Sequence, residues 1–159
     1  MPNLDNGLQL DFSPPIPLVR ALMTEYADQL GIDLCFQDFD AELANLPGRY
    51  AEPAGCLLVA MTENQAAGCA AFRPFADGIC EIKRLYIRRA FRGRGFGRVM
   101  AKALMERASA TGYRAMRLDT LSSMTPAIAL YTSLGFLQIE PYTSAALPEC
   151  AFFEAKLER

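Results

Sequence analysis

The fold is decided by the stretch Ile82-Lys-Arg-Leu-Tyr-Ile-Arg-Arg-Ala-Phe-Arg-Gly-Arg-Gly-Phe-Gly-Arg98. Its first half completes a segment over residues 79–87, rich in isoleucine, leucine and tyrosine, that is typical of a strand. Beyond the glycines, Phe96, Val99 and Met100 recur on one side at helical spacing. The stretch therefore predicts a strand that leads through a glycine-rich turn into a helix over about residues 95–110.

The predicted turn is suited to holding phosphate. A helix that opens directly after a turn collects free backbone N–H groups at the positive end of the helix dipole. Glycines let the backbone approach a ligand closely and adopt conformations that a Cβ would forbid. Arginine side chains add charge-assisted contacts to phosphate oxygens. We expect a diphosphate ligand held by the backbone and side chains of Arg92, Gly93, Arg94, Gly95, Phe96, Gly97 and Arg98.

The turn has three other possible interpretations. A glycine-rich turn on a solvated basic surface would bind nothing, but here strand, glycines, arginines and an apolar-faced helix coincide. A dinucleotide-binding turn fits worse, because the spacing is G-x-G-x-G and an antiparallel meander precedes it. An RNA-binding arginine–glycine tract would lie in a disordered tail, whereas this one lies between a strand and a helix. We expect no nucleic-acid partner.

The length of 159 residues fits a single domain of α/β (α+β) class, spanning 1–159. Residues 1–15 are proline-rich and are expected to be a loose lead-in. Helices are predicted over residues 17–30, 38–46, 95–110 and 126–134. Strands are predicted over residues 56–61, 66–75, 79–87, 115–121, 136–139 and 150–157, the first three as an antiparallel meander.

Composition excludes several kinds of chemistry. The chain has no histidine, which removes Ser–His–Asp and Cys–His nucleophiles and the commonest nitrogen ligand of metals. Its five cysteines form no CxxC pair, so they are interpreted as small buried hydrophobes. No apolar stretch is long enough to cross a membrane and no secretory signal is visible, so we expect a cytoplasmic location and no membrane partner.

Charge is unevenly distributed along the chain. Residues 1–81 carry 12 acidic and 3 basic side chains, whereas residues 82–159 carry 13 basic and 6 acidic ones. Seven of those basic residues lie between Lys83 and Arg98 with no acidic residue among them. This pattern predicts one local anion site and does not predict a protein that coats nucleic acid.

The glycine-rich turn and a second motif together make the chain resemble the GCN5-related N-acetyltransferase (GNAT) superfamily. Arg92-Gly-Arg-Gly-Phe-Gly97 matches the (Gln/Arg)-x-x-Gly-x-(Gly/Ala) turn of that family, and Ala127-Ile-Ala-Leu-Tyr-Thr-Ser-Leu-Gly-Phe136 matches its Ala-x-x-Leu-Tyr-x-x-x-Gly-Phe signature. The resemblance implies a mixed, mostly antiparallel, six- to seven-stranded twisted sheet flanked by about four helices.

The resemblance further implies acetyl-coenzyme A as cofactor, with no metal. Its pyrophosphate would lie on residues 92–98, and its pantetheine arm would run along Leu85, Tyr86 and Ile87 where the fourth and fifth strands splay. The function implied is acetyl transfer to the primary amine of a small molecule, directly within a ternary complex. A non-catalytic acyl-coenzyme A module and a protein or peptide acceptor are the alternatives, and a homodimer is compatible with the family.

Two side chains take catalytic roles by resemblance. Tyr131 matches the helix tyrosine that protonates the departing thiolate, although a half-buried core tyrosine would give the same apolar pattern. Glu81 matches a carboxylate that serves some members as general base, directly or through water. Pairing with Lys83 on the same strand face is its alternative. Met124 stands where many members have asparagine, which weakens any transfer of a specific acceptor geometry.

The resemblance also implies that the region of the first two helices roofs the acceptor pocket, and this region is rich in acidic residues. That region has no basic residue between Arg20 and Arg49. One hypothesis is that these acids steer a small cationic amine, and the alternative is an ordinary solvated helix surface. The acidic residues are Asp28, Asp33, Asp38, Asp40 and Glu42.

Overall fold

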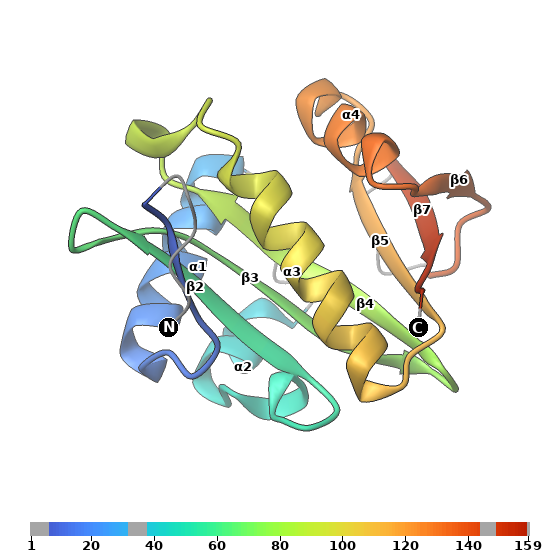
Figure 1. Cartoon of the computed structure of the whole chain (residues 1–159), viewed down its shortest axis with the longest axis horizontal. Coiled ribbons are helices and arrows are strands. Elements are labelled where there is room, and N and C mark those ends of the chain that lie inside the picture. Colours follow the sequence, from blue (N-terminus) through green and yellow to red (C-terminus); the bar gives the residue numbers. More distant parts are fainter. Residues whose placement is uncertain (1–6, 32–37, 144–148, 159) are drawn as a thin grey trace.

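The computed structural model describes residues 7–31, 38–143 and 149–158 (Figure 1). All strands among them belong to one seven-stranded sheet with the order β1-β2-β3-β4-β5-β7-β6. Every neighbouring pair is antiparallel except β4 with β5. The strands are β1 Gln9–Asp11, β2 Cys56–Thr62, β3 Gln65–Ala76, β4 Ile79–Ile87, β5 Ala115–Leu121, β6 Leu137–Ile139 and β7 Cys150–Lys156.

Helices cover both faces of this sheet (Figure 1). On one face, α1 and α2 bury a cluster that includes Leu22 and Phe39. On the other face, α3 and α4 bury a larger cluster that includes Leu104 and Tyr131. The helices are α1 Ile16–Leu30, α2 Phe39–Ala44, α3 Phe96–Thr111 and α4 Thr125–Ser133, with short 3-10 turns at Gly48–Tyr50 and Arg89–Phe91. The expected α/β class, with a mostly antiparallel seven-stranded sheet and about four helices, is confirmed.

The lead-in predicted for residues 1–15 is wrong in part. Gln9–Asp11 forms β1, which pairs antiparallel with β2 through Gln9 and Met61. Leu8 and Leu10 are buried in the core on the α3 side. A strand of three residues beside a proline-rich stretch is too short to show periodicity, and it is stabilised by pairing with a distant segment. Residues 1–6 lie outside the described residues.

Strands β4 and β5 separate soon after they begin. Their parallel pairing is limited to Ile79 with Ala115, Cys80 with Met116, and Glu81 with Arg117. Beyond Glu81, β4 is paired only with β3 on its other side. Among the residues that the structure describes, the edge of β4 that faces β5 therefore has no strand partner over its second half.

A β-bulge centred on Arg84 accompanies this separation. Cys69 pairs with Tyr86 and Ala71 pairs with Lys83, so one residue of β3 lies opposite two residues of β4. Arg84 itself has φ of 62°, in the left-handed region. The extra residue exchanges the two faces of the strand: Ile82 packs on the α3 side, whereas Tyr86 packs on the α1 side. Strict alternation would place both on one face.

The bulge is held by a buried ion pair with α2. The Arg84 guanidinium donates to Glu42 through Nε at 2.9 Å and through Nη2 at 3.0 Å, and the Arg84 side chain is 3% exposed. The same guanidinium lies over the Phe39 ring, 4.9 Å from the centroid. Bidentate pairing of this kind fixes the orientation of the arginine. Helix α2 is thereby tied to the point where β4 changes direction.

We predict that Glu42→Gln lowers the free energy of unfolding by about 3 kcal/mol, because it leaves a buried guanidinium without its countercharge. Urea titration of the purified protein measures this change. Glu52→Gln is the matched control. Glu52 pairs with Arg107 at the surface, where both side chains are more than a third exposed, and its loss should cost no more than about 0.5 kcal/mol. Equal losses in the two variants would contradict the role given to the buried pair.

Candidate active site

A groove of about 730 Å³ lies beside the glycine-rich turn. Its walls come from the end of α1, the second half of β4, the turn, the first residues of α3, and α4. Nine of the ten residues predicted to hold the cofactor line it: Leu85, Tyr86, Ile87, Arg92, Gly93, Gly95, Phe96, Gly97 and Arg98. The sequence thus located one continuous surface, running from β4 to the start of α3.

The turn contains backbone N–H groups that can bind a ligand. Gly93 and Gly95 both have φ of +80°, and Gly95 is the residue at which α3 begins. Within the described chain, the N–H groups of residues 93–98 have no hydrogen-bond acceptor. They lie at the positive end of a 16-residue helix. This arrangement can bind an anion that carries several acceptor oxygens.

The three arginines of the turn differ in their contacts. Arg92 braces the turn, because Nε donates to the Ile87 carbonyl at 2.9 Å and NH2 donates to Gln29 at 2.7 Å. Arg98 donates to Ser133 of α4 at 2.5 Å and lines the groove. Arg94 is the predicted residue that does not line the groove. Its guanidinium lies 3.4 Å from Glu63 and packs over the Phe91 ring.

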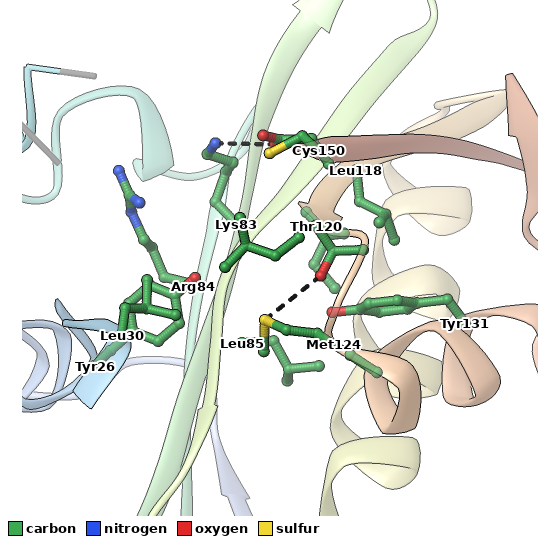
Figure 2. Close-up of a pocket in the computed structure, with 14 residues that line it drawn as sticks. Tyr26, Leu30, Lys83, Arg84, Leu85, Leu118, Thr120, Met124, Tyr131 and Cys150 are labelled. Atoms are coloured by element: carbon green, nitrogen blue, oxygen red, sulfur yellow. Dashed lines mark hydrogen bonds and ion pairs between the residues drawn. The ribbon is translucent and has the colours of Figure 1, made fainter. Parts of the chain in front are cut away.

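A second, smaller cavity of about 110 Å³ opens between the separated strands (Figure 2). Residues from α1, β4, β5 and α4 line it. Five of them also line the groove, so the two spaces adjoin: Tyr26, Leu30, Leu85, Met124 and Ala127. A molecule bound along the groove can therefore meet a second molecule in this cavity.

Tyr131 lies at this cavity. It is 7% exposed, and its ring packs edge-on against Phe136 with centroids 5.6 Å apart. Figure 2 shows its hydroxyl pointing from α4 toward Met124 and into the space between the strands. Burial raises the pKa of Tyr131 well above its ordinary value, with smaller contributions from Tyr26 and Asp119. The group therefore keeps its proton at neutral pH and can donate it.

Glu81 is placed differently. It does not line the cavity, and its side chain is 5% exposed. One oxygen pairs with Arg73 at 3.1 Å, and the other accepts a hydrogen bond from the Tyr142 hydroxyl at 2.8 Å. The alternative pairing of Glu81 with Lys83 is not found, because Lys83 pairs with Asp119 across the gap at 3.4 Å. The structure thus brings Tyr131, but not Glu81, to the cavity wall.

Lys83 and Asp119 are cavity residues to which sequence reasoning gave no role at the site. Asp119 sits within the strand sequence Ala-Met-Arg-Leu-Asp-Thr-Leu, where a carboxylate between apolar residues is itself a signal that was available. Met124, the departure from the family pattern, lines both spaces and accepts a weak hydrogen bond from Thr120 at 3.8 Å.

The acidic residues expected to roof the acceptor pocket include Glu42, which takes part in ion pairs. Glu42 faces two guanidinium groups, those of Arg84 and Arg73, and its charge is compensated. None of the described members of the acidic set lines the cavity. Asp33 lies outside the described residues. The described acids of this set therefore do not form the wall of the cavity.

Comparison with known proteins identifies the class. Residues 18–136 match the model of the acetyltransferase (GNAT) family. A Schizosaccharomyces pombe protein named as an uncharacterized N-acetyltransferase is 39% identical over 142 residues, covering 88% of this chain and 87% of that protein. The zebrafish N-acetylaspartate synthetase is 29% identical over 109 residues, covering 67% of this chain and 39% of the enzyme.

A solved structure shows the same fold. A GNAT family acetyltransferase from Elizabethkingia anophelis, with acetyl-CoA bound, superposes with a TM-score of 0.69 at 20% identity, covering 97% of this chain and all of that one. The family match and the Schizosaccharomyces pombe relative show that the chain is an acyltransferase. The chain belongs to the acetyltransferase (GNAT) family.

We predict that Gly95→Ala weakens binding of coenzyme A by about tenfold, or 1.4 kcal/mol. A side chain at φ of +80° costs about 1–2 kcal/mol, and relieving that strain moves the N–H groups of the turn. Gly112→Ala is the matched control. Gly112 has φ of +115° at the other end of α3, so its substitution should lower stability similarly and leave affinity unchanged. Calorimetric titration distinguishes the two, and equal affinity in both variants would argue against the turn as the binding element.

Proposed function

We propose that this protein transfers an acetyl group from acetyl-coenzyme A to the primary amine of a small molecule, directly within a ternary complex. The proposal rests on one observation, which is that the groove and the smaller cavity adjoin each other. The groove that ends on the N–H groups of residues 93–98 runs into the cavity at which the Tyr131 hydroxyl points. Donor and acceptor can therefore be held together, with a proton donor where they meet.

The residues present fit acetyl-coenzyme A. The diphosphate would be held by the N–H groups of residues 93–98 with Arg92 and Arg98 nearby. The pantetheine arm, which contains two amide groups, would lie along Leu85, Tyr86 and Ile87. Support comes from the edge of β4 facing β5, which beyond Glu81 has no strand partner in the described part of the chain and can accept an extended amide chain. Acetyl-coenzyme A supplies the acetyl group as a thioester and leaves as the thiol.

The proton transfers of the reaction are assigned to two side chains, Glu81 and Tyr131. The acceptor enters as an ammonium with a pKa near 10, so removing its proton at pH 7 costs about 4 kcal/mol. We assign this task to Glu81 acting through water, because its side chain does not reach the cavity wall. Tyr131 gives its proton to the departing sulfur. The amine nitrogen forms the carbon–nitrogen bond and the carbon–sulfur bond breaks. The acylated nitrogen then gives up its second proton, which returns through water to Tyr131, so the products are an amide, a thiol and the proton taken up at Glu81.

Two further features favour a small acceptor. The cavity between the strands is compact, at about 110 Å³. The zebrafish relative is named N-acetylaspartate synthetase, and N-acetylaspartate is an N-acetylated amino acid. A non-catalytic acyl-coenzyme A module is the second candidate, and it would bind the thioester without turnover. The described helices include none that is long and apolar enough to cross a membrane. A cytoplasmic location and a homodimer stay predictions from the sequence.

The test is a pair of measurements on the purified protein. The melting temperature should rise with acetyl-coenzyme A and stay unchanged with NAD or RNA, because a ligand that binds only the folded state stabilises it. Thiol release in the presence of a panel of small amines should then identify turnover. Stabilisation without thiol release for any acceptor would support the binding module, and no stabilisation would overturn the assignment.

We predict that Tyr131→Phe lowers kcat by about 10²- to 10⁴-fold while the affinity for acetyl-coenzyme A stays within a factor of two to three. The raised pKa of Tyr131 also sets the pH dependence. A raised pKa keeps the acid protonated through pH 10, so this group causes no fall in kcat between pH 6 and pH 10. A fall below pH 10 that Tyr131→Phe abolishes would contradict the assignment, as would unchanged kcat in that variant.

Direct transfer makes a prediction for the cysteines. Burial raises the pKa of Cys56, Cys69 and Cys80 to about 12, so these thiols are not nucleophiles at neutral pH. Among the described cysteines, Cys150 lines the smaller cavity between β4 and β5, in which we place the acceptor and which we call the acceptor cavity. We predict that Cys150→Ala keeps kcat within about threefold and that mass spectrometry of the enzyme mixed with acetyl-coenzyme A detects no acetylated cysteine. Loss of activity together with an acetyl-enzyme in the parent protein would replace the ternary complex by a covalent route.

A further inference from the structure

Lys83 and Asp119 form a charge pair inside the acceptor cavity. Lys83 comes from β4 and Asp119 from β5, and the distance between Lys83 Nζ and Asp119 Oδ1 is 3.4 Å. Their side chains are 9% and 8% exposed. Figure 2 shows the Lys83 ammonium and its ion pair on the side of the cavity opposite to α4. The pair spans the two strands just beyond the point where their own hydrogen bonding ends.

Neither member of the pair is fully satisfied. A lysine ammonium has three N–H donors, and a carboxylate has about four acceptor positions. For the residues that the structure describes, Asp119 is the one hydrogen-bond partner of the Lys83 side chain, and Lys83 is the one partner of the Asp119 side chain. Buried charges require further hydrogen bonds to offset the loss of hydration. The remaining donors and acceptors border the cavity and are available to a polar molecule within it.

The charges around the cavity select the kind of molecule. Its lining contains two cationic side chains, Lys83 and Arg84, and one carboxylate, Asp119. Because Arg84 is paired with Glu42, the local balance at the cavity is one positive and one negative group. A polyamine with several positive charges would meet a single carboxylate beside an ammonium. A molecule that carries one charge of each sign side by side matches the pair group for group.

On the basis of the proposed function, we propose that the acceptor is a small zwitterion of the amino-acid class. Its carboxylate binds the Lys83 ammonium, and its amino group binds the Asp119 carboxylate before transfer. Lys83 and Asp119 are then specificity-determining residues for the acetylation carried out at Tyr131. This replaces the hypothesis of a cationic acceptor steered by acidic helices, whose member Glu42 is occupied by Arg84 and Arg73.

The first experiment compares matched acceptors on the intact protein with acetyl-coenzyme A. Small amino acids are set against their decarboxylated amines and their uncharged amides, for example alanine against ethylamine and alaninamide, with spermidine as the polycation. We expect the best amino acid to exceed its decarboxylated partner in kcat/KM by about 10- to 100-fold, the range for a hydrogen bond to a charged group. A preference for the decarboxylated amine or for spermidine would overturn the inference.

The second experiment tests the two residues. Lys83→Met should raise KM for the amino acid by about tenfold or more, leave KM for the matched amine unchanged, and thereby remove the preference. Lys102→Met, at an exposed position on α3, is the control and should change neither value. Because Lys83→Met leaves a buried carboxylate unpaired, the double variant Lys83→Met/Asp119→Leu serves as a second test. It should fold, bind acetyl-coenzyme A and lose selectivity for the zwitterion. An equal change for both acceptors in these variants would contradict the assignment.

A binding measurement separates this inference from the proposed function. With coenzyme A saturating, an amino acid of the preferred kind should raise the melting temperature further, and Lys83→Met should abolish that second increase. If acetyl-coenzyme A stabilises the protein and no zwitterion adds to the effect, the acceptor assignment is wrong and the transferase assignment stands. If acetyl-coenzyme A itself has no effect, the proposed function is wrong.

Discussion

The early separation of β4 from β5 opens the cavity that is lined by Lys83, Asp119 and Tyr131. A parallel pair that continued past Glu81 would fill the centre of the sheet with backbone hydrogen bonds and leave no space for a ligand. The separation coincides with a bulge at Arg84, whose left-handed conformation is costly for a residue with a side chain. The buried ion pair with Glu42 and the packing on Phe39 hold that conformation in place. Helix α2, on one face of the sheet, therefore supports the point at which the sheet opens.

The cavity between β4 and β5 and the groove at the glycine-rich turn adjoin each other and form one continuous space. The turn supplies N–H groups at one end, the free edge of β4 runs along the middle, and Tyr131 lies where the groove meets the smaller cavity. Two of the arginines of the turn contribute partly by bracing it, Arg92 through the Ile87 carbonyl and Arg98 through Ser133. In the proposed binding mode the binding element is chiefly the backbone, so we expect glycine at positions 93 and 95 to matter more than the charge of any one side chain.

Local patterns in the sequence predicted much of this arrangement. The strand over residues 115–121 and the helix that begins after Gly95 are found as predicted, because apolar periodicity and glycine at a left-handed position are local signals. The features that were missed depend on contacts between distant residues. Glu42 and Arg84 are 42 positions apart, and Lys83 and Asp119 are 36 apart, so no window of sequence reveals either pair. The bulge was missed for a related reason, since Arg84 is not a glycine and nothing in its neighbours marks a left-handed residue.

The central claim is that the N–H groups of residues 93–98 bind the diphosphate of the acetyl donor. Calorimetric titration with coenzyme A and with pantetheine, which shares the thiol arm and lacks the diphosphate and nucleotide, tests it most directly. The account predicts that coenzyme A binds at least about 100-fold more tightly, or 2.7 kcal/mol, and that the difference narrows as salt is added. Equal affinities for the two molecules, independent of salt, would contradict it.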